Sequence, residues 1–191
     1  MAERLLDINK GDSLPANDDV YRICIITDRD KKAGNIPSVK SFTLSTPDKE
    51  DNFSLSVDWS KKTTPEQVLI REGIRFKSNT EIYKNYLLRE IFALNVGFLK
   101  NLNEIKNVIY DPTISEKFVM GKPDNPAHSG ILFSPENYDQ YESEITLKIR
   151  EHAKDKFVRV DMETVKIEVE KLRALNYITK PDEKENKSIV G

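Results

Sequence analysis

The chain is poor in the residues that hold metals or form disulfide bonds, with one cysteine and two histidines among 191 residues. A lone cysteine cannot form an internal disulfide, and these three side chains fall short of the four ligands of a structural zinc site. No apolar run approaches the ~18 residues of a membrane span, and the first residues contain no apolar signal core. We therefore expect a cytoplasmic protein that does not enter the membrane and has no metal and no cofactor.

Net charge is also scarce. Thirty basic and 32 acidic side chains leave a formal charge of −2, so the sequence gives no strong signal for binding nucleic acid. Apolar residues make up 38% of the chain, enough for one domain with a hydrophobic core. We expect a flexible arm over residues 1–19, a single domain over 20–178 and a flexible tail over 179–191, and the pattern does not define an oligomeric state.

Strand-like segments dominate the first two thirds of the chain. Residues 20–27 are apolar on both faces, and residues 53–59 alternate with Ser54, Ser56 and Asp58 on the polar side. We expect 53–59 to pair antiparallel with 38–44, with a turn at 46–52. Further strands are predicted at 107–112, 129–133 and, briefly, 157–160.

Helical patterns follow the strands. A capping box of Thr64 and Gln67 starts a helix over 63–73, and a longer helix is predicted from residue 79 to at least 94. Residues 96–99 fit either a continuation of this helix or a strand. Two more helices are predicted at 134–156, capped by Ser134, and at 161–178, capped by Asp161. The fold class is therefore α+β: a mixed or mainly antiparallel sheet of four to six strands, packed helices and a helical C-terminal third.

Several short motifs follow one another along the chain in a characteristic order. Tyr21-Arg22 lies in the first strand, SVKSF and LSVDW follow, and VGFL, Tyr-Asp-Pro and the Asn-Pro-Ala-His of residues 125–128 come later. Over residues 20–133 this order resembles a widespread group of small bacterial proteins of unknown function. The resemblance implies a compact α+β core whose strands meet near His128, and it implies no activity.

His128 is one candidate site residue. Histidine can act as an acid, a base or a ligand, and the turn at Asn125 would fix its direction. The structural alternative, which we favour, is that the turn and His128 only hydrogen-bond a loop. No serine or cysteine lies at a motif spacing that defines a catalytic pair, and Ser129 should point to the opposite face.

Arg22 is the second candidate, because a guanidinium inside an apolar strand needs a partner. A structural ion pair with Asp58 or Asp111 is the favoured interpretation. The functional alternative is an anion pocket formed by Arg22, Ser41 and His128. The candidate anion- or ligand-binding residues are therefore Arg22, Ser41, Asp58, Asn125 and His128.

Arg22 and Ser41 also allow an enzyme hypothesis, because ADP-ribosyltransferase-type folds use an Arg or His strand, a Ser strand and a later Glu. Here only Glu116 could supply the third residue, by elimination. The four tyrosines at helical spacing, Tyr83, Tyr86, Tyr138 and Tyr141, are predicted to be core and rim positions rather than a base-stacking surface. Cys24 is predicted to be a buried apolar residue, and His152 to lie at a helix edge.

The sequence contains no glycine-rich phosphate loop, HExxH or GxSxG motif. We therefore expect a bacterial, non-catalytic accessory or protein-interaction module with a protein partner at the charged helices over 134–178. The alternative is a nucleotide- or anion-handling enzyme that uses Arg22, Ser41 and His128.

Overall fold

A computed structural model of the chain describes residues 8–25, 36–75, 89–114 and 124–174. The described strands are β1 (Asp19–Ile25), β2 (Ser54–Trp59), β3 (Arg89–Asn95), β4 (Ile105–Tyr110), β5 (His128–Phe133) and β6 (Phe157–Val158). The described helices are η1 (Val39–Phe42), α2 (Thr46–Glu50), η2 (Ser60–Lys62), α3 (Pro65–Arg75), α5 (Val96–Lys100), α6 (Pro135–Ala153) and α7 (Met162–Ala174). Their mixture of strands and helices confirms the α+β class.

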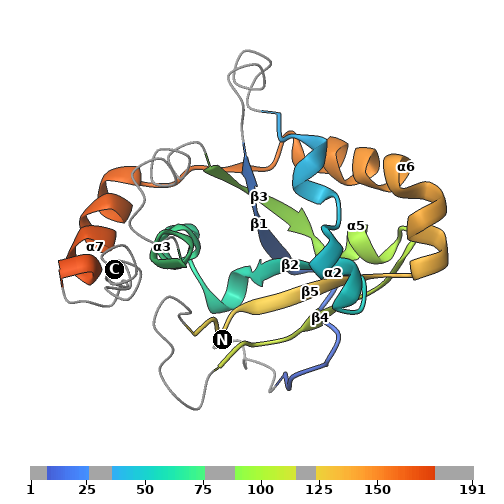
Figure 1. Ribbon diagram of the computed structural model, residues 1–191, viewed down its shortest axis with the longest axis horizontal. Coiled ribbons are helices and arrows are strands. Elements are labelled where there is room, and N and C mark those ends of the chain that lie inside the picture. Colours follow the sequence, from blue (N-terminus) through green and yellow to red (C-terminus); the bar gives the residue numbers. More distant parts are fainter. Residues whose placement is uncertain (1–7, 26–35, 76–88, 115–123, 175–191) are drawn as a thin grey trace, which may run out of the picture.

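The six strands form one sheet in the order β4-β5-β2-β1-β3-β6, and every neighbouring pair is antiparallel. β1 pairs with β3 over all seven of its residues, whereas its register with β2 covers only Val20–Trp59 and Tyr21–Asp58. β1 and β2 therefore separate beyond Tyr21. In Figure 1, α3 and α7 lie on one side of this sheet, and α6, α2 and α5 lie on the other.

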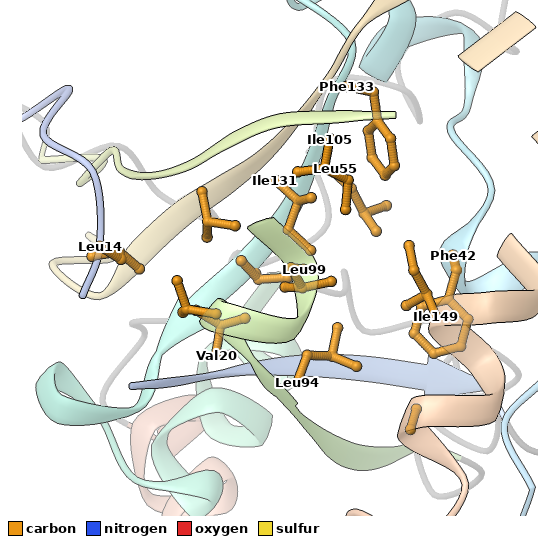
Figure 2. Close-up of a cluster of buried hydrophobic side chains, with 14 of the residues drawn as sticks. Leu14, Val20, Phe42, Leu55, Leu94, Leu99, Ile105, Ile131, Phe133 and Ile149 are labelled. Atoms are coloured by element: carbon orange, nitrogen blue, oxygen red, sulfur yellow. The ribbon is translucent and has the colours of Figure 1, made fainter. Parts of the chain in front are cut away.

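The larger hydrophobic core covers the sheet face turned toward α6, which we call the α6 face. Ile149 of α6, Phe42 of η1 and Leu99 of α5 meet the strand residues Val20, Leu55, Leu94 and Ile131, as Figure 2 shows. All of these side chains are buried. Directly paired residues of antiparallel strands point to the same face of a sheet. The β2–β5 register therefore places the residues that alternate with Leu55 and Ile131 along these strands on the α6 face as well.

A smaller cluster covers the opposite face over β1 and β3, which we call the α3–α7 face. Val68 and Leu69 of α3 and Val165 and Val169 of α7 bury Ile91 of β3. Tyr21 and Ile23 of β1 pack against the edge of this cluster. The two helices thus cover one half of this face, and β2 and β5 lie in the other half.

Local signals set several helix ends as predicted. The Thr64 hydroxyl accepts from the Gln67 amide, and the Gln67 side chain accepts from the Thr64 amide, which completes the predicted capping box of α3. Asp161 accepts from two backbone amides at the start of α7. Ser134 occupies the N-cap position of α6, but its side chain makes no capping hydrogen bond.

Three predictions about residues 38–52 and 89–95 are wrong. The expected strand at 38–44 contains the 3-10 helix η1, because β2 pairs with β5 and β1 instead. The expected turn at 46–52 contains α2, which a Ser45–Asp48 capping box starts. Residues 89–95 are strand β3 rather than helix, since pairing with β1 overrides the three- and four-residue apolar spacing.

The stretch VGFL then forms helix α5, and Asn95 caps it by accepting from the Phe98 amide at 3.0 Å. The part of the predicted helix at residues 79–88 lies outside the described residues. Within the arm expected at 1–19, residues 11–14 bond to β4, for example through the Leu14 amide and the Val108 carbonyl, and Leu14 is buried in the main core. Residues 1–7 and the tail from 175 onward are outside the described part of the chain.

Among the described residues, no helix combines the length and the apolar character needed to cross a membrane.

Candidate functional site

Arg22 lies on the α6 face at the point where β1 and β2 separate. Its Nε donates to the Ser41 carbonyl at 2.9 Å, and its Nη1 donates to the Ser56 carbonyl at 2.6 Å. Burial lowers the pKa of Arg22, and neighbouring carboxylates only partly oppose this effect. The guanidinium therefore replaces ladder hydrogen bonds that a continuous β1–β2 pairing would have supplied.

The carboxylates expected to pair with Arg22 have other partners. Asp58 accepts from Arg71 at 3.3 Å and from the Asn125 side chain at 2.6 Å. Asp111 forms an ion pair with Lys10 at 2.9 Å. Within the described part of the chain, the acceptors that hydrogen-bond the Arg22 side chain are therefore backbone carbonyls, and the structural ion pair predicted for Arg22 is replaced by carbonyl contacts.

Asp58, Asn125 and His128 come together on the α3–α7 face. Asp58 is the register partner of His128 across β2 and β5, so both side chains lie on the same face. Asn125 closes the turn before β5, because its side-chain oxygen accepts from the Ala127 amide and its carbonyl accepts from the His128 amide. The turn and Asp58 thus fix the position where β5 begins.

The two ring nitrogens of His128 have different partners. Nδ1 lies 2.6 Å from the Asp111 carbonyl oxygen, and Nε2 lies 3.2 Å from the Ser56 hydroxyl. A carbonyl can only accept, so Nδ1 carries the proton in the neutral ring and Nε2 accepts from Ser56. The loop hydrogen bond expected for His128 is present, and a serine contact accompanies it.

The sheet separates the five predicted site residues into two groups. Arg22 follows Tyr21 along β1 and therefore points to the α6 face, where Ser41 also packs, whereas Asp58, Asn125 and His128 lie on the other face. Ser56 is the link between the groups, because its carbonyl binds Arg22 and its hydroxyl meets His128. This geometry does not support one pocket shared by Arg22, Ser41 and His128.

The site hypotheses drawn from the sequence did not include three polar residues of this region, Ser56, Arg71 and Thr63. Ser56 is exposed beside His128, and Arg71 of α3 bridges Asp58 and the Thr63 hydroxyl, which it reaches at 3.0 Å. The alternation of 53–59 already placed Ser56 on the polar side of its strand. The missing information was the pairing partner, because only the register with β5 brings Ser56 next to His128.

Other chemically active side chains are enclosed. Cys24 is buried, and desolvation raises the pKa of its thiol to about 12, which makes it a poor nucleophile. Tyr138 is fully buried, and its hydroxyl accepts from the Leu44 amide at 2.7 Å, whereas Tyr141 is 41% exposed. Tyr138 is therefore a core position and Tyr141 a rim position, and α6 departs from helical geometry at Tyr141. Tyr83, Tyr86 and Glu116 lie outside the described residues.

A hollow of about 450 Å³ lies between α5 and α6. It is lined by Phe98 and Leu102 and by the α6 residues Glu144, Leu147, Lys148, Glu151 and His152. The His152 ring stacks on Phe98 with a centroid distance of 3.8 Å and an interplanar angle of 5°. This apolar hollow lies on the α6 side of the sheet and is separate from the polar cluster at His128.

Comparisons with known proteins add no relative to these observations. No family model matches the chain, and neither the search of curated proteins nor the search of solved structures finds a similar protein. The likeness to small bacterial proteins therefore stays a prediction. Across the described residues, no three or more His, Cys, Asp or Glu side chains are grouped in a way that could hold a metal ion.

Proposed function

We propose that the protein is a bacterial cytoplasmic accessory protein that binds a protein partner through the hollow between α5 and α6. The single observation that carries this proposal is the position of Leu147, which is 46% exposed beside Phe98 and Leu102. Exposed apolar surface next to a concave apolar floor is typical of a contact site for another chain. The buried lone Cys24 supports a reducing compartment.

The distribution of exposed apolar residues favours the same region. Five large apolar side chains are markedly exposed within the described residues, and four of them lie between residues 135 and 174: Tyr141, Leu147, Phe157 and Ile167. The fifth is Ile114. Isolated exposed apolar residues need no explanation, but Leu147 lies in a hollow and shares helix α6 with Tyr141.

The charge of α6 indicates the chemistry of the partner. Its sequence PENYDQYESEITLKIREHA contains five acidic and two basic residues. At the hollow Lys148 is paired with Glu104 and Glu144, and Glu151 is paired with Arg150 and Lys154, so the charge that is left on α6 is its net acidic excess. We therefore infer that the partner presents an amphipathic segment with an apolar anchor for the hollow and basic residues for the rim.

The alternative, a nucleotide- or anion-handling enzyme, has less support from the geometry. It requires Arg22, Ser41 and His128 around one ligand. Arg22 and Ser41 lie on the α6 face and hydrogen-bond each other, whereas His128 lies on the α3–α7 face. The Arg22 guanidinium is also engaged by two backbone carbonyls, which leaves it poorly placed to clamp a phosphate.

The test uses a photocrosslinking amino acid in place of Leu147, introduced in the native host, with the same substitution at Ile114 as the matched control. We expect a discrete covalent adduct from position 147 and none of that mass from position 114. The captured protein is then produced separately and its affinity is measured by calorimetry. Leu147→Asp should weaken binding by about 30-fold, the loss typical of an interface hot spot, and Ile114→Asp should leave binding unchanged.

Three results would contradict the proposal: no adduct at position 147, equal adducts at both positions, or unchanged affinity of the Leu147→Asp variant. An adduct with the mass of two copies of this chain would replace the foreign partner with self-association. Thermal unfolding of each variant checks the fold, and an exposed leucine should tolerate this change with little loss of stability.

A further inference from the structure

Ser56 and His128 form a hydrogen-bonded pair on the half of the α3–α7 face that α3 and α7 do not cover. Ser56 is exposed near the middle of β2, and its hydroxyl lies 3.2 Å from Nε2 of His128. We propose that Ser56 is a nucleophile toward activated acyl donors, such as aryl esters or thioesters, and that His128 is its general base. This site is separate from the hollow between α5 and α6, and the protein-binding function neither requires nor excludes it.

The orientation of the imidazole is that of a base directed at the serine. The hydrogen bond of 2.6 Å from Nδ1 to the Asp111 carbonyl leaves the lone pair of Nε2 free to accept the Ser56 proton. The Asp111 carboxylate lies 3.9 Å from Nδ1, where its negative charge stabilises an imidazolium once the proton has moved. One residue therefore contacts the ring through its backbone carbonyl, which fixes the tautomer, and places its carboxylate near the same nitrogen.

The surroundings of Ser56 leave room for a substrate. Its register partner on β5 is Gly130, so the position directly opposite Ser56 carries no side chain. Arg71 contacts Asp58. Asp58 lies two residues after Ser56 on the same face of β2, about 7 Å from it along the strand. The guanidinium brings positive charge to the face on which an oxyanion would form.

The proposed step is an acyl transfer to the protein. The Ser56 oxygen attacks the acyl carbon while Nε2 of His128 removes the hydroxyl proton. The new carbon–oxygen bond replaces the bond to the leaving group, which departs as an alkoxide, phenolate or thiolate. Nε2 then returns its proton to that leaving group. The products are acyl-Ser56, the protonated leaving group and neutral His128.

The first experiment treats the purified chain with an alkyl fluorophosphonate, which reacts with base-activated serines as fluoride leaves. Peptide mass spectrometry should locate one adduct at Ser56, and S56A should abolish it. H128N retains a side-chain donor for the Asp111 carbonyl but has no base at the Nε2 position, and it should slow labelling at least ~100-fold. The matched control is S54A, which removes a serine from the same strand face and should label at the wild-type rate.

A second measurement keeps the test independent of how well a phosphonate fits the site. S56C introduces a thiol next to His128, and the buried Cys24 leaves it the only accessible one. Iodoacetamide should alkylate S56C at least ~10-fold faster than S56C/H128N, because the imidazole accepts the thiol proton. Labelling of wild-type Ser56 that H128N does not change, no labelling at all, or equal alkylation of the two cysteine variants would overturn the proposal.

Discussion

Asp18 should be one of the costliest polar residues to remove, because it satisfies the buried ring nitrogen of Trp59. The Asp18 carboxylate is 4% exposed, accepts from Nε1 of Trp59 at 2.9 Å and forms an ion pair with Lys61 at 3.0 Å. Trp59 itself is 2% exposed. Asp18→Ala leaves the indole N–H buried without this acceptor.

The size of the effect follows from these two contacts. An unsatisfied buried donor costs about 1–3 kcal/mol. The Lys61 ion pair adds at most about 1 kcal/mol, because the lysine is 46% exposed and is screened by solvent. Asp18→Ala should therefore lower the free energy of unfolding by about 1–4 kcal/mol. Asp18→Asn keeps an oxygen that can accept from the indole and should lose only about 1 kcal/mol.

Urea unfolding followed by far-UV circular dichroism provides the assay for all variants, because Trp59 is the only tryptophan in the chain and the Trp59→Phe variants have no tryptophan fluorescence. Trp59→Phe removes the donor, so adding Asp18→Ala to it should cost clearly less than the single change does in the wild-type chain. The reasoning is refuted if Asp18→Ala and Asp18→Asn destabilise equally, or if Asp18→Ala stays within about 0.5 kcal/mol of wild type.

Two further predictions concern close contacts elsewhere in the fold. Gly130→Ala places a Cβ 2.5 Å from the Ser54 hydroxyl oxygen and should lower the free energy of unfolding in urea by about 1–3 kcal/mol. Adding Ser54→Ala should recover most of that loss. A double variant as unstable as the single one would show that this contact is not the cause. The Nε2 atom of His152 accepts from the Asn95 amide at 3.3 Å, and burial lowers the pKa of this histidine. The stability that neutral His152 contributes is therefore present above the unfolded pKa of about 6.5, and it is lost as the pH falls through the lower pKa of the folded state. His152→Gln keeps an acceptor and should flatten the decline in melting temperature between about pH 7 and 5, and parallel curves for the two proteins would contradict this explanation.

The elements that the sequence predicts well are those that local chemistry determines. The capping box at Thr64 and the acceptor at Asp161 satisfy amides within one helical turn, so no distant residue is needed to specify these helix starts. Strand β5 likewise ends and helix α6 begins within a residue of the predicted positions, because Ser134 and Pro135 mark their junction. Such signals can be recognised wherever the rest of the chain lies.

The elements that the sequence predicts badly depend on long-range pairing. Residues 89–95 have an apolar spacing compatible with a helix, and seven register pairs with β1 make them a strand. Phe42 fits an exposed strand pattern equally well, but the structure buries it under α6 in a 3-10 turn. No local feature of either segment reveals which partner strand is available.

The same limit explains why the candidate site was only partly anticipated. Grouping Arg22, Ser41 and His128 required a guess about which faces of three strands coincide, and the β1–β2 register places Arg22 on the face opposite His128. The residue that joins the two sides, Ser56, lies 72 positions from His128, and its motif LSVDW does not indicate which strand pairs beside it. Its backbone is held by Arg22 from one face and its hydroxyl meets the imidazole on the other. Arg22 thus holds strand β2 in place from the α6 face, and Ser56 on β2 meets His128 on the α3–α7 face, where we propose that the two residues form a nucleophile and its base.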